Sequence, residues 1–136
     1  MAATLRLEIV TPEATVFSQD VHMVTLPAFG GQIGIFPRHV PLLTRIVPGE
    51  LIVRKDGETE FLAIGGGIVE ITAGRVAIAT DMAVAVKEID EARVEEARRR
   101  AEARLQDKIS DEEVATVNAS LARALAQLRV KRRRRG

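Results

Sequence analysis

The residues of this 136-residue chain that could carry chemistry are its histidines, paired carboxylates and clustered glycines. The two histidines, His22 and His39, have no partner at metal-ligand spacing, so a structural role is the simpler interpretation of His22. Carboxylates pair only as neighbours in helix-like segments (Glu95 with Glu96), and adjacent helical positions do not face each other. Gly65–Gly67 lacks a following Lys and Ser/Thr, so it predicts a bulge or tight strand crossing rather than a phosphate loop. No catalytic centre and no metal site are expected.

The amino-acid composition excludes several further classes of site and partner. The chain has no cysteine, which excludes disulfides, thiolate metal sites and cysteine nucleophiles. It has no Trp or Tyr and only four Phe, so base-stacking surfaces are missing and no nucleic-acid partner is expected. No apolar run approaches the ~20 residues of a membrane-spanning helix, and no secretory signal is visible. These observations favour a non-catalytic binding or structural protein.

The net charge of +1 hides an asymmetry along the chain. Residues 131–135 hold five of the 20 basic residues, so residues 1–130 carry 15 basic against 19 acidic groups, a net of −4. The default interpretation of such a terminal run is a solvated, disordered end. The alternatives are contact with an acidic partner and attraction to a membrane surface.

Residues 4–86 follow the period-two pattern of β-strands. Leu51–Lys55 and Glu58–Ile64 flank Asp56-Gly57, and this arrangement predicts a hairpin with a tight turn. Ile68–Thr72 and Arg75–Thr80 flank Ala73-Gly74 in the same way. Several segments are apolar on both faces, which is typical of strands in a small sandwich or flattened barrel.

Residues 88–130 follow the period of an α-helix. One apolar stripe runs from Val94 to Ile109 and a second from Val114 to Leu128, and both are narrow and rich in alanine. Ser110 stands three residues before Glu113, which is a capping box. The sequence therefore predicts an antiparallel helix hairpin that turns near residues 107–111 and is weakly held, because it buries little apolar area. Strands first and helices last indicate an α+β fold.

The segment 33–44 is apolar, contains two prolines and is too constrained for a regular central strand. It is either a buried connection or a rigid apolar surface for a protein partner, and the residues alone favour neither. Gly30-Gly31 and Gly34, just before and within it, are expected to mark a bulge or a close strand crossing.

Four motifs resemble, in order along the chain, the epsilon subunit of bacterial F-type ATP synthases. They are LEIVTP at residues 7–12, GIFPRHVPLLT at 34–44, IGGGIVEI at 64–71 and IDEARVEEARRRAEARL at 89–105, and ARALAQLRV at 122–130 is similar to the end of the family's second helix. The resemblance implies a flattened β-sandwich of about ten strands (residues 1–86) and a C-terminal antiparallel two-helix hairpin with a basic tail (residues 87–136).

The resemblance also implies a function. The family's epsilon subunit is a non-catalytic part of the central stalk, whose sandwich binds the gamma subunit and rests on the c-subunit ring. It couples proton-driven c-ring rotation to ATP synthesis in the catalytic head, and its helices extend to inhibit ATP hydrolysis. The implied location is peripheral, at the cytoplasmic face of the bacterial inner membrane.

The resemblance extends to individual residues of the predicted contact surface. The loop around Gly30-Gly31-Gln32 corresponds to the family's contact with the polar loops of the c ring, with Gln32 in place of a common carboxylate. His39 corresponds to a histidine between two apolar runs on the stalk-facing surface. The residues expected to contact gamma or the c ring are Gly31, Gln32, Phe36, His39, Pro41 and Leu42.

Some family members bind ATP on the folded hairpin, and that use is the alternative function implied here. Ile89, Asp90, Arg93 and Arg123 match the corresponding motif positions. Val94, Val84 and Gln127 depart from the pattern of the tight binders, so weak ATP binding or none is expected, with no other cofactor. An N-cap role for Asp90 explains that residue without a ligand.

The resemblance assigns the basic residues of the second helix and tail to the catalytic head. When the hairpin extends, these residues meet an acidic segment of the beta subunit. They are Arg123, Arg129, Lys131, Arg132, Arg133, Arg134 and Arg135.

Overall fold

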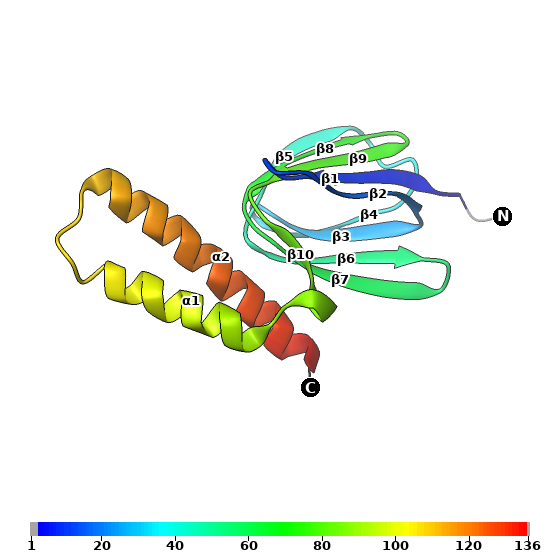
Figure 1. Ribbon diagram of the computed structural model, residues 1–136. Coiled ribbons are helices and arrows are strands. Elements are labelled where there is room, and N and C mark those ends of the chain that lie inside the picture. The colour runs from blue at the N-terminus through cyan, green and yellow to red at the C-terminus, as the bar shows by residue number, and fades with distance from the viewer. Residues whose placement is uncertain (1–2, 136) are drawn as a thin grey trace.

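The computed structural model describes residues 3–135 and contains ten strands followed by helices (Figure 1). The strands are β1 (Leu5–Val10), β2 (Thr15–Val21), β3 (Met23–Ala28), β4 (Gly31–Ile35), β5 (Leu42–Ile46), β6 (Gly49–Lys55), β7 (Glu58–Ile64), β8 (Gly67–Thr72), β9 (Arg75–Thr80) and β10 (Ala83–Ala85). A single 3₁₀ turn, η1 (Val86–Glu88), leads into α1 (Glu91–Arg104) and α2 (Asp111–Arg135). The predicted order of a strand region followed by a helix hairpin is confirmed.

The strands form two layers of a flattened sandwich. One layer has the order β4-β3-β6-β7-β10 and the other β5-β8-β9-β1-β2. The layers join where β3 meets β5 through the single pair Ala28–Ile46, so the sheet folds over at that point. Neighbouring strands are antiparallel except β1 and β9. The two layers also meet away from the β3–β5 junction, where Lys55 of β6 donates a hydrogen bond of 2.6 Å to Gln19 of β2.

The tight turn that the sequence predicts at Asp56-Gly57 is present. Asp56 and Gly57 both have positive φ, +52° and +79°, in the turn between β6 and β7. Gly30 and Gly31 also have positive φ, and Gly30 lies in the turn from β3 to β4 while Gly31 begins β4, so the expectation of a bulge or crossing there is wrong. Gly67 does mark a close crossing, because a Cβ at this position would lie 1.9 Å from the carbonyl oxygen of Ala79.

Large branched side chains from both layers fill one interior. Leu7, Leu26, Ile35, Leu62 and Ile78 are among the fully buried members of this cluster. The cluster contains strand residues only, so the interior of the sandwich is complete without the helices.

Local signals start both helices. The side chain of Asp90 accepts a hydrogen bond of 3.2 Å from the backbone N–H of Arg93 and so caps α1. The Ser110 hydroxyl accepts one of 3.1 Å from the Glu113 N–H and donates one of 3.4 Å to the Glu113 carboxylate, so Ser110 caps α2 at the predicted position. The turn between the helices covers residues 105–110, where the sequence places it.

The hairpin contacts the sandwich through one end of α2 (Figure 1). Ala126 and Val130 of α2 pack with Ala63, Met82 and Ile89 in a second, smaller apolar cluster. None of the residues 91–104 that form α1 is buried. The helices are therefore attached to the outside of a finished sandwich.

The basic tail is helical, and the default expectation of a disordered end is wrong. Helix α2 continues through Arg135 without a break after Val130. Its last turns lie against the sandwich, where ion pairs and hydrogen bonds hold the basic side chains. A run of arginines suggests a solvated segment, yet here the partners are acidic and aromatic groups far away in sequence.

Candidate functional site

Apolar side chains stand exposed in the loop that joins β4 to β5, at the start of β5 and in the β3–β4 turn. Phe36 and Leu43 have exposed fractions of 59% and 67%, and Phe29, Val40 and Leu42 are also exposed. The alternative of a buried connection is wrong, because a buried connection would hide these side chains. We call these five residues the apolar loop surface; such a patch on a rigid body is a typical protein-binding feature.

Backbone contacts hold this loop in one shape. Arg38 has a φ of +68°, and its N–H donates a hydrogen bond of 3.1 Å to the carbonyl of Ala73. The Nδ1 of His39 donates to the carbonyl of Val40 at 2.6 Å, and its backbone N–H donates to Phe36. His39 therefore orders the loop that displays the apolar side chains.

The six residues predicted for gamma or c-ring contact lie at two places. Phe36, His39, Pro41 and Leu42 belong to the β4–β5 loop or its junction with β5. Gly31 and Gln32 begin β4, where both are exposed beside the β3–β4 turn. Phe29 and Leu43, which the sequence prediction omitted, extend the exposed surface, and Arg45 lies 5.6 Å from the centroid of the Phe29 ring.

The residues predicted for ATP binding surround one shallow pocket of about 400 Å³ between the two helices and β10. Ile89, Asp90, Arg93 and Arg123 all line it. So do the three residues that depart from the tight-binding pattern, Val84, Val94 and Gln127.

Structural contacts already engage several polar groups of this pocket. Asp90 caps α1 through the Arg93 N–H. Arg123 lies 3.4 Å from the Asp81 carboxylate and donates to Ser120. Gln127 donates to the sulfur of Met82 at 3.0 Å.

The predicted inhibitory residues divide into two groups. Lys131 donates to the Val86 carbonyl at 3.0 Å, and Arg132 pairs with Glu95 at 2.8 Å and with Glu91. Arg134 pairs with Glu50 of β6. The exposed side chains of Arg129 and Arg133, in contrast, form no ion pair with other described residues. Arg135 ends α2, and its side chain lies outside the described residues.

Ion pairing favours the ionised forms of Glu95 and Arg134. Hydrogen bonding from Arg98 lowers the pKa of Glu95 most, burial acts in the opposite direction, and Arg132 adds to the lowering. Hydrogen bonding to Glu50 raises the pKa of Arg134 above its ordinary value. Sequence analysis missed Glu50 and Phe61 as partners of the tail, because their positions in β6 and β7 give no local signal of it.

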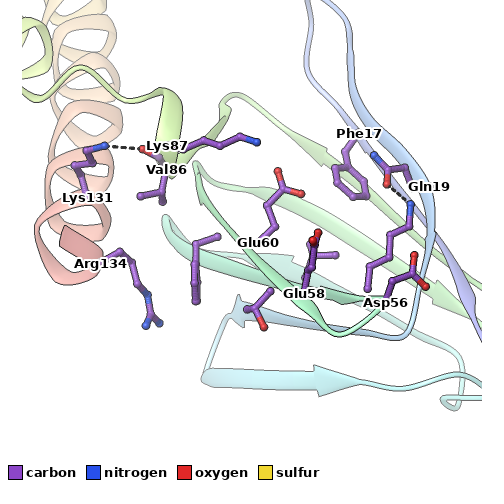
Figure 2. Close-up of a pocket in the computed structure, with 13 residues that line it drawn as sticks. Phe17, Gln19, Asp56, Glu58, Glu60, Val86, Lys87, Lys131 and Arg134 are labelled. Atoms are coloured by element: carbon purple, nitrogen blue, oxygen red, sulfur yellow. Dashed lines mark hydrogen bonds between the residues drawn. The ribbon is translucent and has the colours of Figure 1, made fainter. Parts of the chain in front are cut away.

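A groove of about 880 Å³ lies beside the end of α2 (Figure 2). Phe17 and Phe61 contribute apolar walls, and Lys131 and Arg134 stand on the helical side. Glu58 and Glu60 supply carboxylates on the strand side, so both signs of charge line the groove.

A metal site and a membrane-spanning helix are two further features that residues 3–135 could contain. This part of the chain has no group of three or more acidic or histidine side chains that could hold a metal ion. None of its helices is both long and apolar enough to span a membrane.

A rigid sandwich with an exposed apolar surface, and a helix hairpin attached to its outside, define a protein that binds other proteins. The chain belongs to the delta/epsilon chain family of ATP synthases. The family's beta-sandwich domain matches residues 4–86, and its long alpha-helix domain matches residues 87–132. Epsilon chains are subunits of the synthase and not its catalytic ones, which confirms the expectation of a non-catalytic subunit.

Relatives and solved structures agree with this membership. The ATP synthase epsilon chain of Herpetosiphon aurantiacus is 45% identical over 131 residues, which is 96% of each chain. That of Laribacter hongkongensis is 40% identical, covering 93% of this chain and 92% of its own. A chain of the Euglena gracilis mitochondrial ATP synthase has a TM-score of 0.67 at 22% identity, covering 96% of this chain and 78% of that one. A chain from the central stalk and c-ring structure of the Tetrahymena thermophila enzyme has a TM-score of 0.65 at 16% identity, covering 93% and 96%. At these identities the solved structures support the fold.

Proposed function

We propose that this chain is the epsilon subunit of a bacterial F-type ATP synthase and acts in the central stalk. Its sandwich would bind the gamma subunit and rest on the c ring, and so couple proton-driven rotation to ATP synthesis in the alpha/beta head. The complex would hold it peripherally at the cytoplasmic face of the cell membrane. Family membership and names of the relatives support this assignment.

The observation that carries the proposal is the apolar loop surface. Its side chains are exposed on a body whose own interior is already complete. A stiff sandwich transmits force, because packed cores deform little. We assign Phe36, His39, Pro41 and Leu42, with Gly31 and Gln32 on the neighbouring turn, to the contact with gamma and the c ring.

The proposal divides the chain at residue 86. Residues 1–86 would form the binding sandwich, and residues 87–136 a regulatory hairpin that inhibits ATP hydrolysis when it extends toward the head. The separation of the two apolar clusters supports this division, since the hairpin can leave without exposing the interior of the sandwich.

Deleting residues 88–136 tests the division. The remaining sandwich should still co-purify with gamma, and ATP hydrolysis by the assembled complex should rise. Loss of gamma binding in a sandwich that keeps its β-type circular dichroism would contradict the proposal. An unchanged hydrolysis rate would remove the inhibitory role and leave the stalk role standing.

The inhibitory contact itself needs variants that leave the docked hairpin intact. Of the residues assigned to it, Arg129 and Arg133 have exposed side chains without an ion pair among the described residues. Replacing both by Ala removes charge available to an acidic partner and leaves the docking contacts in place. We expect faster hydrolysis by the complex, most clearly at low salt, because such attraction is screened by ions. A rate equal to wild type at low salt would exclude these two residues from the contact.

ATP sensing is the second candidate function. The observation that favours it is the convergence of Ile89, Asp90, Arg93 and Arg123 on one pocket. Calorimetric titration of the full chain with ATP tests it, with Arg93→Ala as the matched variant because the cap of α1 uses only the backbone N–H of Arg93. Heat at millimolar ATP that Arg93→Ala abolishes would support a sensor; no heat leaves the structural role alone.

A further inference from the structure

One carboxylate near the surface of the sandwich is buried and ion-paired to the last helical turn. Glu50 lies at the start of β6 and has an exposed fraction of 7%. The Nε and Nη2 atoms of Arg134 donate hydrogen bonds to its two oxygens at 2.6 and 2.5 Å. This is a two-pronged pairing that a guanidinium makes and an ammonium cannot reproduce.

An aromatic ring on the next strand completes this arrangement. The guanidinium carbon of Arg134 lies 4.0 Å from the centroid of the Phe61 ring. Phe61 belongs to β7, which pairs with β6 along its length. Arg134 therefore contacts two strands of one layer, by an ion pair with the first and a cation–π contact with the second.

The other basic residues described in the tail do not hold the hairpin on the strands in this way. Arg132 pairs with Glu91 and Glu95 of α1, so these contacts move with the hairpin. Lys131 bonds the carbonyl of Val86 in η1, the linker that leads into the helices.

The other contacts between the hairpin and the sandwich contribute less to docking. The apolar cluster at the contact is small: Ala63 and Ala126 bury little area each, and Met82, Ile89 and Val130 supply the rest. Arg123 and Asp81 also bridge α2 to the sandwich at 3.4 Å, but the Asp81 side chain is 46% exposed whereas that of Glu50 is 6% exposed, and an ion pair with a solvated carboxylate contributes less.

We propose that Arg134, Glu50 and Phe61 form a latch that holds the hairpin on the sandwich. When the hairpin leaves, Glu50 and Arg134 both regain water. If Arg134 alone is removed, the docked state keeps a buried carboxylate without its partner, and this shifts the equilibrium toward the free hairpin. Because Glu50 occupies the Nε and Nη2 donors of Arg134 in the docked state, the latch also makes Arg134 less available to an acidic partner. This last consequence, unlike the latch itself, rests on the proposed function.

Distance measurements on the full chain test the latch directly. The chain has no cysteine, so Arg54→Cys on β6 and Arg133→Cys on α2 allow two spin labels to be placed uniquely. Double electron–electron resonance then gives the fractions of docked and free hairpin. Arg134→Met keeps a long stem over Phe61 and removes the charge, Glu50→Gln keeps the shape of the other partner, and Arg129→Met is the matched control.

We expect one dominant short distance in the otherwise unmodified chain and a free fraction that rises about tenfold in Arg134→Met. Glu50→Gln should raise it less, since the amide still accepts a hydrogen bond, and Arg129→Met should leave it unchanged. The double variant Glu50→Met with Arg134→Met should restore docking, because an apolar pair replaces the ion pair. The proposal is overturned if Arg134→Met behaves like Arg129→Met, if the double variant stays as free as Arg134→Met, or if the unmodified hairpin is already free.

Hydrolysis by the assembled complex separates the latch from the proposed inhibition. Glu50→Gln should lower the hydrolysis rate, because more hairpins are released to extend and Arg134 keeps its charge for an acidic partner. A distance change without a rate change keeps the latch and removes the inhibitory role. A rate change without a distance change overturns the latch.

Discussion

In the sandwich, branched apolar side chains from both layers fill one interior, whereas the hairpin is attached to it by a small apolar cluster and a few ion pairs. Leu7, Leu26 and Ile78 are fully buried among strand residues alone. Helix α1 buries none of its residues 91–104, and its carboxylates pair with arginines of both helices. The difference indicates that the sandwich has a large free energy of unfolding, whereas the hairpin can undock from it at a small free-energy cost.

The largest effect should come from a cavity in the sandwich interior. Leu7→Ala on β1 should lower the free energy of unfolding by about 3 kcal/mol, because the site is enclosed and relaxes only partly. Denaturant titration followed by circular dichroism measures this change. Leu125→Ala on α2, whose side chain is exposed, should change the same free energy by less than about 0.5 kcal/mol. Equal effects of the two variants would contradict the contrast between the regions.

A glycine at the crossing between β8 and β9 should come next. Gly67→Ala should cost about 2 kcal/mol of unfolding free energy, since its Cβ would meet the backbone of Ala79 and force the strands apart. Gly74→Ala, at the β8–β9 turn, is the control, because no atom lies within 4 Å of the added Cβ. Thermal unfolding of both variants measures these changes in stability. A Gly67→Ala variant as stable as Gly74→Ala would show that the crossing is not rigid.

Sequence alone predicts the features that depend on local signals. The Asp56-Gly57 turn and the Ser110 cap act over a few residues, so their spacing specifies them. The boundary between strands and helices follows from the change of period, which is also local. The Gly30-Gly31 turn was mistaken for a bulge or crossing because glycine alone does not distinguish these structures.

The attachment of the tail could not be predicted in this way. Arg134 meets Glu50 across 84 positions of sequence, and a run of arginines suggests solvation rather than a specific partner. The same limit applies to Phe29 and Leu43, whose exposure depends on how the layers fold over. The residues that the family resemblance assigns to ATP binding line one pocket, and ATP binding there stays a prediction.

Crowding the small cluster under α2 should release the hairpin and spare the sandwich. Ala126→Leu adds side-chain volume where no space remains, at a cost of about 1–2 kcal/mol to docking. Hydrogen exchange should accelerate in α2 and stay slow in the strands. Ala119→Leu, at an exposed position of the same helix, should leave both unchanged. Faster exchange in the strands of Ala126→Leu would mean that the two regions unfold together.

The smallest effect concerns the charges within the hairpin. The pKa of Glu95 is lowered, most by Arg98, so the ionised form is favoured in the folded state. This stabilisation is present above the ordinary pKa of 4.5 and is lost as pH falls through the lower folded value. The packing of α1 on α2 should therefore loosen below about pH 4, as Arg132 loses its ionised partner.

Amide exchange or NMR shifts of α1 between pH 5 and pH 3 measure this loosening. Glu95→Gln should remove most of the pH dependence in that interval, because the group that titrates is gone. Glu96→Gln is the matched control, since Glu96 pairs with Arg100 on the surface of the same helix and both side chains are mostly exposed. If Glu96→Gln removes the dependence instead, the interhelical pair is not what joins the two helices, and the hairpin must be held by its narrow apolar stripes alone.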